Sequence, residues 1–390
     1  MQSKSGKPRI VLFLTCSLLF WFTLYTYIPT MTPYLSNLGF SYTMIGLIGG
    51  AYGFSQMLIR APLGITSDRI GRRKLFIILG LLAGAISSFG MFLTTNAFLI
   101  LAMRLISGIS ASAWVTFTVM YSGYFDKDKI ASSISYLFMV NGLSLVLAKL
   151  AGGVVADRFG HEYTFLLGGI VGTIAVVLSL FITESSASSE HLPSVKDLLG
   201  VIKNKNLIAM SILSIFTHMV LFATINTFTP QAANRSGADA MQLGILSTIA
   251  SLPMILSSFI CAKLFLKRVS VRLIIAVGFL ITILGVVIIP LADGMSAIYI
   301  SAVTVGFGCG LCMSALLSCC TATVDDSRRS AAMGFYQAFY ALGMFLGPLL
   351  VGIVVDQSNL NGGFYASAVL ALAGFILTYL LMNKEIEQED

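Results

Sequence analysis

Charged residues are scarce in this sequence of 390 residues. Lys, Arg, Asp and Glu together make up 11% of the chain, hydrophobic residues make up 57%, and the mean hydropathy is +0.90. A soluble domain carries roughly a quarter charged residues. The composition therefore excludes a soluble protein and predicts an integral membrane protein.

Catalytic and metal-binding signatures are also absent. There is no G-x-S-x-G or H-E-x-x-H motif and no cluster of His and Asp at one depth of the predicted helices, which argues against a membrane enzyme. The glycine-rich run 306–310 lacks the Lys-Ser/Thr of a phosphate-binding loop, so we assign it to helix packing. No cofactor, metal site or disulfide framework is expected from the cysteines, which lie in predicted helices without His or carboxylate neighbours: Cys16, Cys261, Cys309, Cys312, Cys319 and Cys320.

Long apolar runs are what the sequence does contain. A helix that crosses the bilayer needs about 20 mostly apolar residues. Basic residues precede the first run, but it is too long for a signal peptide and begins a series, so we expect it to be the first helix. The fold class is predicted to be all-α and membrane-spanning, with twelve helices near 10–35, 41–63, 74–95, 97–122, 130–156, 161–183, 206–231, 240–262, 272–292, 296–322, 331–355 and 362–383.

Basic residues are distributed unevenly between the two sets of connections. With the N-terminus in the cytoplasm, nineteen of the 24 Lys and Arg fall in cytoplasmic segments, and the external connections hold only Arg158 and Arg235. This asymmetry predicts that both termini are cytoplasmic. The net charge of +7 therefore reflects topology and not nucleic-acid binding. Twelve helices with short cytoplasmic loops favour a bacterial plasma membrane.

The two halves of the chain repeat at an offset near 199 residues. Residues 154–157 correspond to residues 353–356, and Pro29 corresponds to Pro230 at a slightly larger offset. Parallel halves related by an axis along the membrane normal are typical of some transporter folds. The prediction is two pseudo-symmetric six-helix bundles, with residues 1–183 as the N-terminal bundle, 184–205 as a cytoplasmic linker and 206–390 as the C-terminal bundle.

Small residues are concentrated on the second predicted helix. Gly46, Gly49, Gly50 and Gly53 form two overlapping G-x-x-x-G pairs. Such pairs let helix backbones approach closely within a membrane. We therefore predict a close-packing face here.

A patterned cluster follows the second run. It reads G-x-x-x-D-R-x-G-R-R and consists of Gly64, Asp68, Arg69, Gly71, Arg72 and Arg73. A small residue permits close packing, a glycine permits a tight turn, and the bases hold the loop in the cytoplasm. This pattern resembles motif A of the major facilitator superfamily. The resemblance implies two bundles that rock between inward-open and outward-open states, with Asp68 as a cytoplasmic latch against the N-terminal end of helix eleven near Ser330.

Three bases lie within predicted helices, where a buried charge is costly and marks a functional candidate. Arg60, near the cytoplasmic end of helix two, either snorkels to the membrane interface or serves the cytoplasmic gate network, and we favour the structural role. Arg104 begins a stretch similar to motif B of proton-coupled members of the superfamily, with Ser107 and Ser110 replacing its Gln and second Gly. A guanidinium here can bind an anion, organise a hydrogen-bond network or repel a proton.

Lys149 is the least expected of the three. It occupies the proline position of a stretch that resembles the antiporter motif C, which weakens the inference of antiport. Lys149 and Arg104 are expected at comparable depth. They either share a cavity that binds a carboxylate or phosphate, or Lys149 pairs with Asp157 or Glu162.

His218, in the middle of helix seven, completes the candidates for coupling or central charge, because imidazole titrates near neutral pH. A structural role is the alternative. Aromatic rings with a few polar groups suit a cavity for an amphipathic organic molecule. The candidates for lining that cavity are Trp21, Tyr25, Trp114, Asn141, Asn226, Tyr336, Gln337 and Tyr340.

These features predict a secondary active transporter that moves a small organic molecule across the plasma membrane by alternating access. Similarity to drug:proton antiporters implies efflux with protons as the coupling ion, and a monomer in the lipid bilayer suffices. None of the seventeen Asp and Glu lies within a predicted helix core, which counts against an exporter of lipophilic cations. Two alternatives stay open: an organic-anion porter that uses Arg104 and Lys149, and a non-transporting membrane sensor with the same fold.

Overall fold

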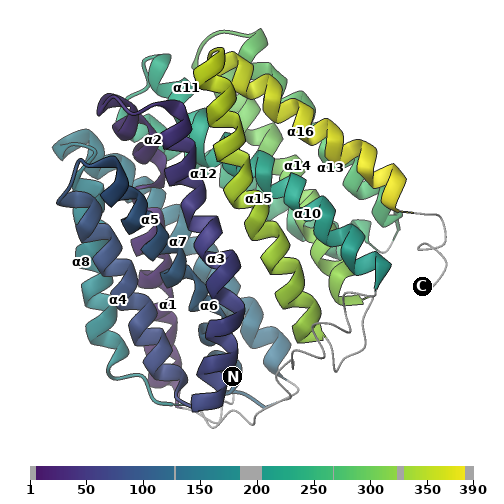
Figure 1. The fold of residues 1–390 in the computed structure, drawn as a ribbon. Helices are drawn as coiled ribbons and strands as arrows, with labels where there is room; N and C mark the ends of the chain where they lie inside the picture. Colours follow the sequence, from purple (N-terminus) through teal and green to yellow (C-terminus); the bar gives the residue numbers. More distant parts are fainter. Residues whose placement is uncertain (1–5, 127–128, 185–203, 267, 323–328, 383–390) are drawn as a thin grey trace.

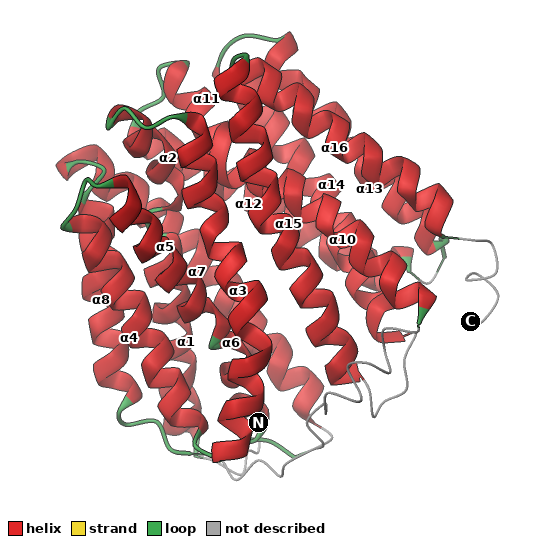
Figure 2. Ribbon diagram, viewed as in Figure 1, coloured by secondary structure: helices red, strands yellow, loops and turns green. Residues whose placement is uncertain are grey.

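The computed structural model describes residues 6–126, 129–184, 204–266, 268–322 and 329–382. Within these ranges the chain is helical and contains no strand (Figure 2). Most of the predicted linker 184–205 lies outside the described residues. The elements are α1 (Lys7–Tyr25), α2 (Ile28–Asn37), α3 (Tyr42–Ile70), α4 (Arg73–Phe92), α5 (Ala97–Ser112), α6 (Trp114–Ser122), α7 (Ile130–Phe159), α8 (Tyr163–Ser179), α10 (Lys205–Ala223), η2 (Thr224–Phe228), α11 (Thr229–Arg235), α12 (Ala240–Ile260), η3 (Cys261–Phe265), α13 (Val271–Leu291), α14 (Met295–Ala322), α15 (Arg329–Gln357) and α16 (Leu360–Leu381).

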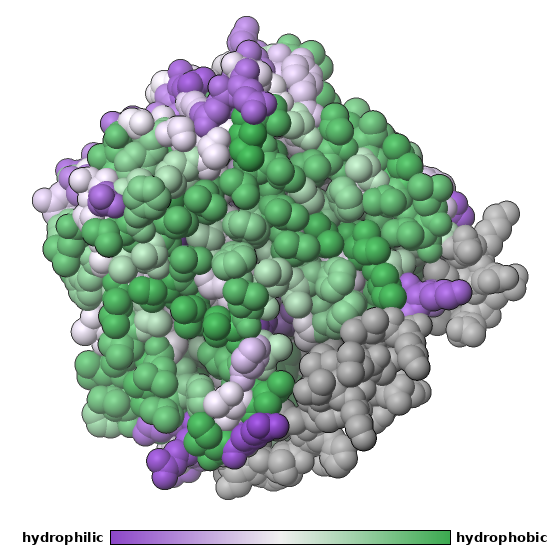
Figure 3. Space-filling view, in the orientation of Figure 1, coloured by the Kyte–Doolittle hydropathy of each residue, from purple (hydrophilic) through white to green (hydrophobic). Residues whose placement is uncertain are grey.

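These elements form twelve successive helical units in the described part of the chain, one for each predicted run. Ten are long and apolar enough to cross a membrane, and α8 is a shorter apolar helix. A broad hydrophobic belt covers the visible face of the molecule, with hydrophilic residues above and below it (Figure 3). The all-α, membrane-spanning fold class is confirmed.

The first helix of each half is broken, although the sequence suggested two unbroken runs. Between α1 and α2 the break precedes Pro29, and in the second half the π-helical turn η2 precedes Pro230. A proline ring clashes with the carbonyl four residues earlier, which is that of Tyr25 in one half and Asn226 in the other. The clash explains why both helices depart from regular geometry at equivalent places.

The molecule has two ends, which we name by the chain. The terminal end carries the start of α1 and the end of α16, and the distal end is opposite. Figure 1 shows α3 and α15 side by side near the distal end, close to α2 and α11, and diverging toward the terminal end. The two bundles therefore meet at the distal end.

The glycine face of α3 forms the main contact between the bundles. A Cβ added at Gly46 would overlap the carbonyl oxygen of Pro348 on α15, and one added at Gly50 would lie 2.5 Å from the carbonyl oxygen of Phe345. The predicted close-packing face is confirmed. The glycine run of α14 also packs closely within its own bundle, where a Cβ at Gly308 would lie 2.6 Å from a backbone oxygen of α13.

The motif A cluster differs from its prediction in one respect. We expected a loop, but α3 continues to Ile70, because no residue breaks the helix before Gly71. Gly71 then ends it in the left-handed region, at φ 69°, as predicted for a turn glycine. Gly64 is not a close-packing position here, because an added Cβ would make only ordinary contact with Val115 at 3.5 Å.

The latch predicted for Asp68 stays a prediction. The side chains of Asp68 and Ser330 lie outside the described residues. The backbone places Asp68 in the last turn of α3, at the terminal end, where Arg69 and Arg72 are exposed. Arg73 is buried at the start of α4.

Candidate functional site

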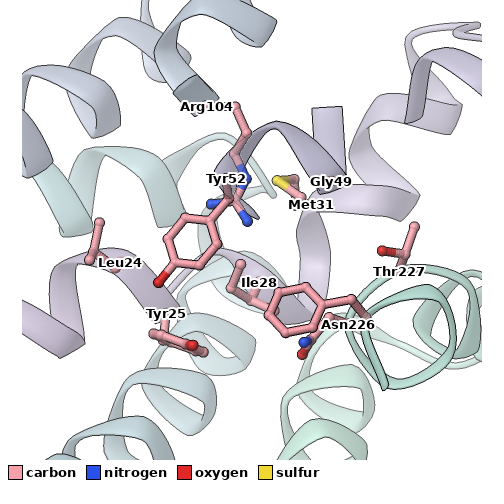
Figure 4. A pocket seen from close by; sticks show the side chains of 10 residues that line it. Leu24, Tyr25, Ile28, Met31, Gly49, Tyr52, Arg104, Asn226 and Thr227 are labelled. Carbon is pink, nitrogen blue, oxygen red and sulfur yellow. The ribbon is translucent and has the colours of Figure 1, made fainter. Parts of the chain in front are cut away.

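A small pocket lies between the two bundles, at the level where the first helix of each is broken. One wall comes from the break between α1 and α2, and the opposite wall comes from η2. Such breaks free side chains and backbone groups to face a ligand. Figure 4 shows Arg104 at one side of the pocket and Asn226 at the other. The lining residues are Leu24, Tyr25, Ile28, Met31, Gly49, Tyr52, Arg104, Phe222, Asn226 and Thr227.

Arg104 is the only charged residue that lines this pocket. Its side chain is 3% exposed, and it donates to the Tyr27 hydroxyl at 3.1 Å and to Ser107 Oγ at 3.2 Å. The guanidinium carbon lies 4.8 Å from the ring centroid of Tyr52. The Nε atom is buried without a partner. Neutral groups therefore hold the cation, and part of its hydrogen-bonding capacity is unused.

Lys149 joins the two bundles near the pocket without lining it. Its Nζ, on α7, donates to Ser251 Oγ at 2.6 Å and to the Ser247 carbonyl at 3.3 Å, both on α12. It also lies 5.9 Å from the ring centroid of Tyr25, which does line the pocket. Beside it, α7 and α12 approach so closely that a Cβ at Gly244 would be 2.7 Å from the Lys149 carbonyl oxygen.

Both sequence alternatives for Lys149 need correction. The lysine pairs with neither Asp157 nor Glu162 in the described part of the chain, because its Nζ is directed to α12. It also does not share a lining with Arg104. The expectation that the two bases form one anion site is wrong for this conformation, and Lys149 instead forms a contact between the bundles.

Removing the Ser251 hydroxyl should weaken this contact. In Ser251→Ala, Lys149 keeps only a carbonyl partner, and we expect a loss of about 1 kcal/mol, seen as a lower thermal unfolding temperature in detergent. Combining it with Lys149→Met should restore the temperature, because no buried ammonium then lacks a partner. Ser258→Ala, which removes a bond within one bundle, is the control. Additive effects of the Ser251 and Lys149 changes would contradict the assignment.

A second cluster joins the bundles nearer the terminal end. Arg60 Nη1 on α3 donates to the hydroxyl of Tyr340 on α15. The Tyr340 ring stacks on His218 of α10, with centroids 4.5 Å apart and planes at 14°. His218 is buried, and its Nδ1 faces the Ser214 carbonyl at 2.9 Å. The structural role expected for Arg60 is therefore a contact between the bundles.

The remaining predicted cavity residues are dispersed. Trp21 and Trp114 pack edge to face at 5.1 Å and lie outside the pocket lining. Tyr336 is buried and packs edge to face on Tyr340. The remaining two, Asn141 on α7 and Gln337 on α15, are partly buried and also lie outside the pocket lining. Of the eight predicted residues, the pocket brings together Tyr25 and Asn226.

Comparison with known protein families shows to which family the chain belongs. The model of the Major Facilitator Superfamily matches residues 13–324 and 212–389. The chain belongs to the major facilitator superfamily. It is therefore a multi-pass membrane transporter and not an enzyme.

Relatives and solved structures agree with this assignment. The transporter is 24% identical over 371 residues to the quinolone resistance protein NorA of Staphylococcus aureus, with 93% of this chain and 94% of the relative covered. It is 22% identical over 365 residues to an uncharacterized MFS-type transporter of Methanocaldococcus jannaschii, with 91% and 93% covered.

The same fold occurs in solved transporter structures. The nucleoside transporter NupG superposes with a TM-score of 0.79 at 17% identity, covering 98% of this chain and 100% of that one. A bacterial homologue of the human lysosomal transporter Spinster, in an inward-facing and occupied conformation, superposes with a TM-score of 0.80 at 15% identity, covering 97% of each chain.

Sequence reasoning missed most of the contacts that close the distal end of the transporter. The Asp356 carboxylate, at the end of α15, accepts the backbone N–H groups of Tyr42 and Thr43 at 2.8 and 2.7 Å and so caps α3 of the other bundle. Thr32 Oγ1 donates to the Thr227 carbonyl at 2.7 Å. The sequence places Asp356 in the repeat of residues 154–157 and 353–356, but only the fold shows that it faces the start of α3.

Proposed function

We propose that this transporter exports a small organic molecule by alternating access, coupled to protons. The observation that carries the proposal is the position of the pocket. It lies between the bundles, at the break in the first helix of each, and the distal contacts close over it. The charge asymmetry of the sequence would place the terminal end in the cytoplasm. The closed end would then be external, and the structure would correspond to a state that is closed to the outside.

Export is supported by similarity to a resistance protein. NorA is named for quinolone resistance, and a transporter confers resistance when it removes the compound. At 24% identity the cargo itself does not carry over. The direction of transport and the small organic nature of the cargo are therefore the parts of the proposal that this relative supports.

Coupling to protons is supported by the cluster of Arg60, Tyr340 and His218. These residues lie on three helices, of which α3 belongs to one bundle and α10 and α15 to the other. Among the described residues, Tyr340 of α15 stacks on His218, and Arg60 of α3 contacts the same tyrosine. Protonating the imidazole would place a second positive charge beside the Tyr340 ring that already contacts Arg60, and like charges repel. Proton uptake would thereby favour separation of the bundles.

A test uses inside-out vesicles with an acidic interior and an internal pH dye. Candidate cargo is added outside, which corresponds to the cytoplasmic side. An exporter of the proposed kind should release protons from the interior as the cargo enters. In the His218→Gln variant, cargo should still enter the vesicles down its own concentration gradient, but no protons should leave with this entry.

The same vesicles separate the alternatives. Cargo that binds to the protein but never enters the vesicles would indicate a sensor and reject the transport function. Entry without proton release in the unchanged protein would reject proton coupling alone. Normal proton release in His218→Gln would place coupling elsewhere in the chain.

A further inference from the structure

We infer that the pocket selects an organic anion with an apolar, flat body, and that Arg104 binds its negative charge. The inference rests on the proposed transport function and names the class of its cargo. Four observations carry it: a buried guanidinium without an acidic partner, donors of that guanidinium that remain unused, the aromatic walls around it, and further positive charge near the pocket.

The first observation is the missing counter-charge. The first acidic residue of the sequence is Asp68, at the terminal end of α3, and the next is Asp126. Helices α1 to α6 therefore bring no carboxylate to the membrane interior. Helices α10 to α12 contain no Asp or Glu either. Within the described residues Arg104 is held only by hydroxyl groups and aromatic rings. A buried charge in this state is costly, and an anionic ligand would supply the missing partner.

The second observation is that part of the hydrogen-bonding capacity of Arg104 is unused. Its side chain is 97% buried in the protein, yet it lines the pocket and its Nε has no partner. An Arg side chain offers five N–H donors in a planar fork that matches a carboxylate. Two of its contacts are to the Tyr27 hydroxyl and Ser107 Oγ, both neutral. The remaining donors suit one carboxylate or a similar monovalent anionic group.

The third observation concerns the shape and polarity of the walls. Tyr25, Tyr52 and Phe222 contribute aromatic rings, and Ile28 and Met31 contribute aliphatic surface. Asn226 faces the pocket from the other bundle, opposite Arg104 (Figure 4). The cavity between these walls is only about 10 Å³ in this conformation, which is room for about one water molecule, so the bundles would separate to admit a ligand. The walls suit a ligand with an apolar body and a polar group at the end away from its charge. It would also touch both bundles at once.

The surroundings disfavour a cation. Lys149 borders the pocket through the Tyr25 ring, at 5.9 Å from its centroid. Because Arg104 and Lys149 are both positive and no acidic side chain lines the pocket, a cationic ligand would meet repulsion without compensation. Repulsive elements of this kind determine specificity as much as attractive ones.

The test compares three probes of nearly equal shape and different charge: naphthoate, naphthamide and naphthylmethylammonium. Binding to the purified full-length protein in nanodiscs of uncharged lipid is measured by titration calorimetry. We expect naphthoate to bind at least about tenfold more tightly than the amide, because charge-assisted hydrogen bonds are about twice as strong as neutral ones. The ammonium probe should bind most weakly. Equal affinities, tightest binding of the ammonium, or no binding of any probe would overturn the inference.

Variants assign the selectivity to Arg104. In Arg104→Gln the naphthoate affinity should fall at least about tenfold and the naphthamide affinity should change little, and Arg104→Lys should recover part of the loss. The control is Arg272→Gln on α13, which removes the same charge at a position outside the pocket lining and away from the contacts between the bundles, and should leave naphthoate binding within about twofold. An equal loss of both probes in Arg104→Gln would show a structural role and overturn the assignment.

Flux measurements distinguish this inference from the proposed function. Selective naphthoate binding without entry into vesicles would preserve the anion site and reject transport. Proton-coupled entry of lipophilic cations, with no preference for anions, would preserve transport and reject the anion site.

Discussion

Replacing Gly46 with alanine should abolish most transport while leaving the protein folded. Its Cβ would overlap the carbonyl oxygen of Pro348 on the other bundle, and neither backbone can move without separating α3 from α15. Overpacking of this kind costs about 1–3 kcal/mol, which we expect to reduce the transport rate at least about tenfold by opposing distal closure. The measurement is cargo flux into vesicles containing equal amounts of each protein.

The matched control is Gly142→Ala. Gly142 lies on α7, opposite α12 of the other bundle, but its added Cβ would make only ordinary contact with Ile255 at 3.7 Å. This variant should transport normally. Gly50→Ala, with a Cβ 2.5 Å from the Phe345 carbonyl oxygen, should behave like Gly46→Ala. Normal flux in both α3 variants would mean that the distal interface does not take part in the transport cycle.

Removing the Asp356 carboxylate should open the distal end. Asp356 accepts two backbone N–H groups at the first turn of α3, where the helix dipole also favours negative charge. Loss of such a cap costs about 1–2 kcal/mol, so Asp356→Ala should shift the equilibrium between closed and open distal ends about 5–30-fold toward open. The readout is the reaction of Thr32→Cys with an impermeant maleimide, because Thr32 is fully buried in the closed state.

Asp157 provides the control from the other half of the repeat. It occupies the position equivalent to Asp356, but the helix that it would cap, α12, already has Asp239 at its own N-terminus, in a capping box with Gln242. Asp157→Ala should therefore leave maleimide reactivity unchanged. Equal reactivity of the Asp157 and Asp356 variants would show that the cap across the bundles is not what holds the distal end closed.

The sequence predicted what depends on local composition. Apolar runs specify the crossings, the glycine pattern specifies a face that another helix can approach, and Gly71 ends its helix as a turn glycine should. The breaks near Pro29 and Pro230 could not be predicted from proline alone, because Pro62 and Pro253 lie inside helices that continue past them.

Which helix faces which could not be predicted in the same way. Lys149 illustrates the difficulty, because its depth in the membrane follows from its position in the run, whereas its partner on α12 depends on how two bundles meet. The same holds for Trp21 and Trp114, which pack against each other inside one bundle. Tyr52, a pocket residue that we missed, looks in the sequence like any other tyrosine among glycines.

The central claim is that the bundles rock about the pocket, so that one end opens as the other closes. Distances between spin labels test it directly. In a background where the native cysteines, mostly buried, are replaced, one label pair is placed at Asn37 and Ser236 at the distal end. The other pair is placed at Ile70 and Lys205 at the terminal end. All four positions are exposed, and each pair joins the two bundles.

The Gly46→Ala change supplies the perturbation. The account predicts that it lengthens the distal distance and shortens the terminal distance in the same sample, because opening one end of a rocking pair closes the other. A longer distal distance with an unchanged or longer terminal distance would contradict alternating access.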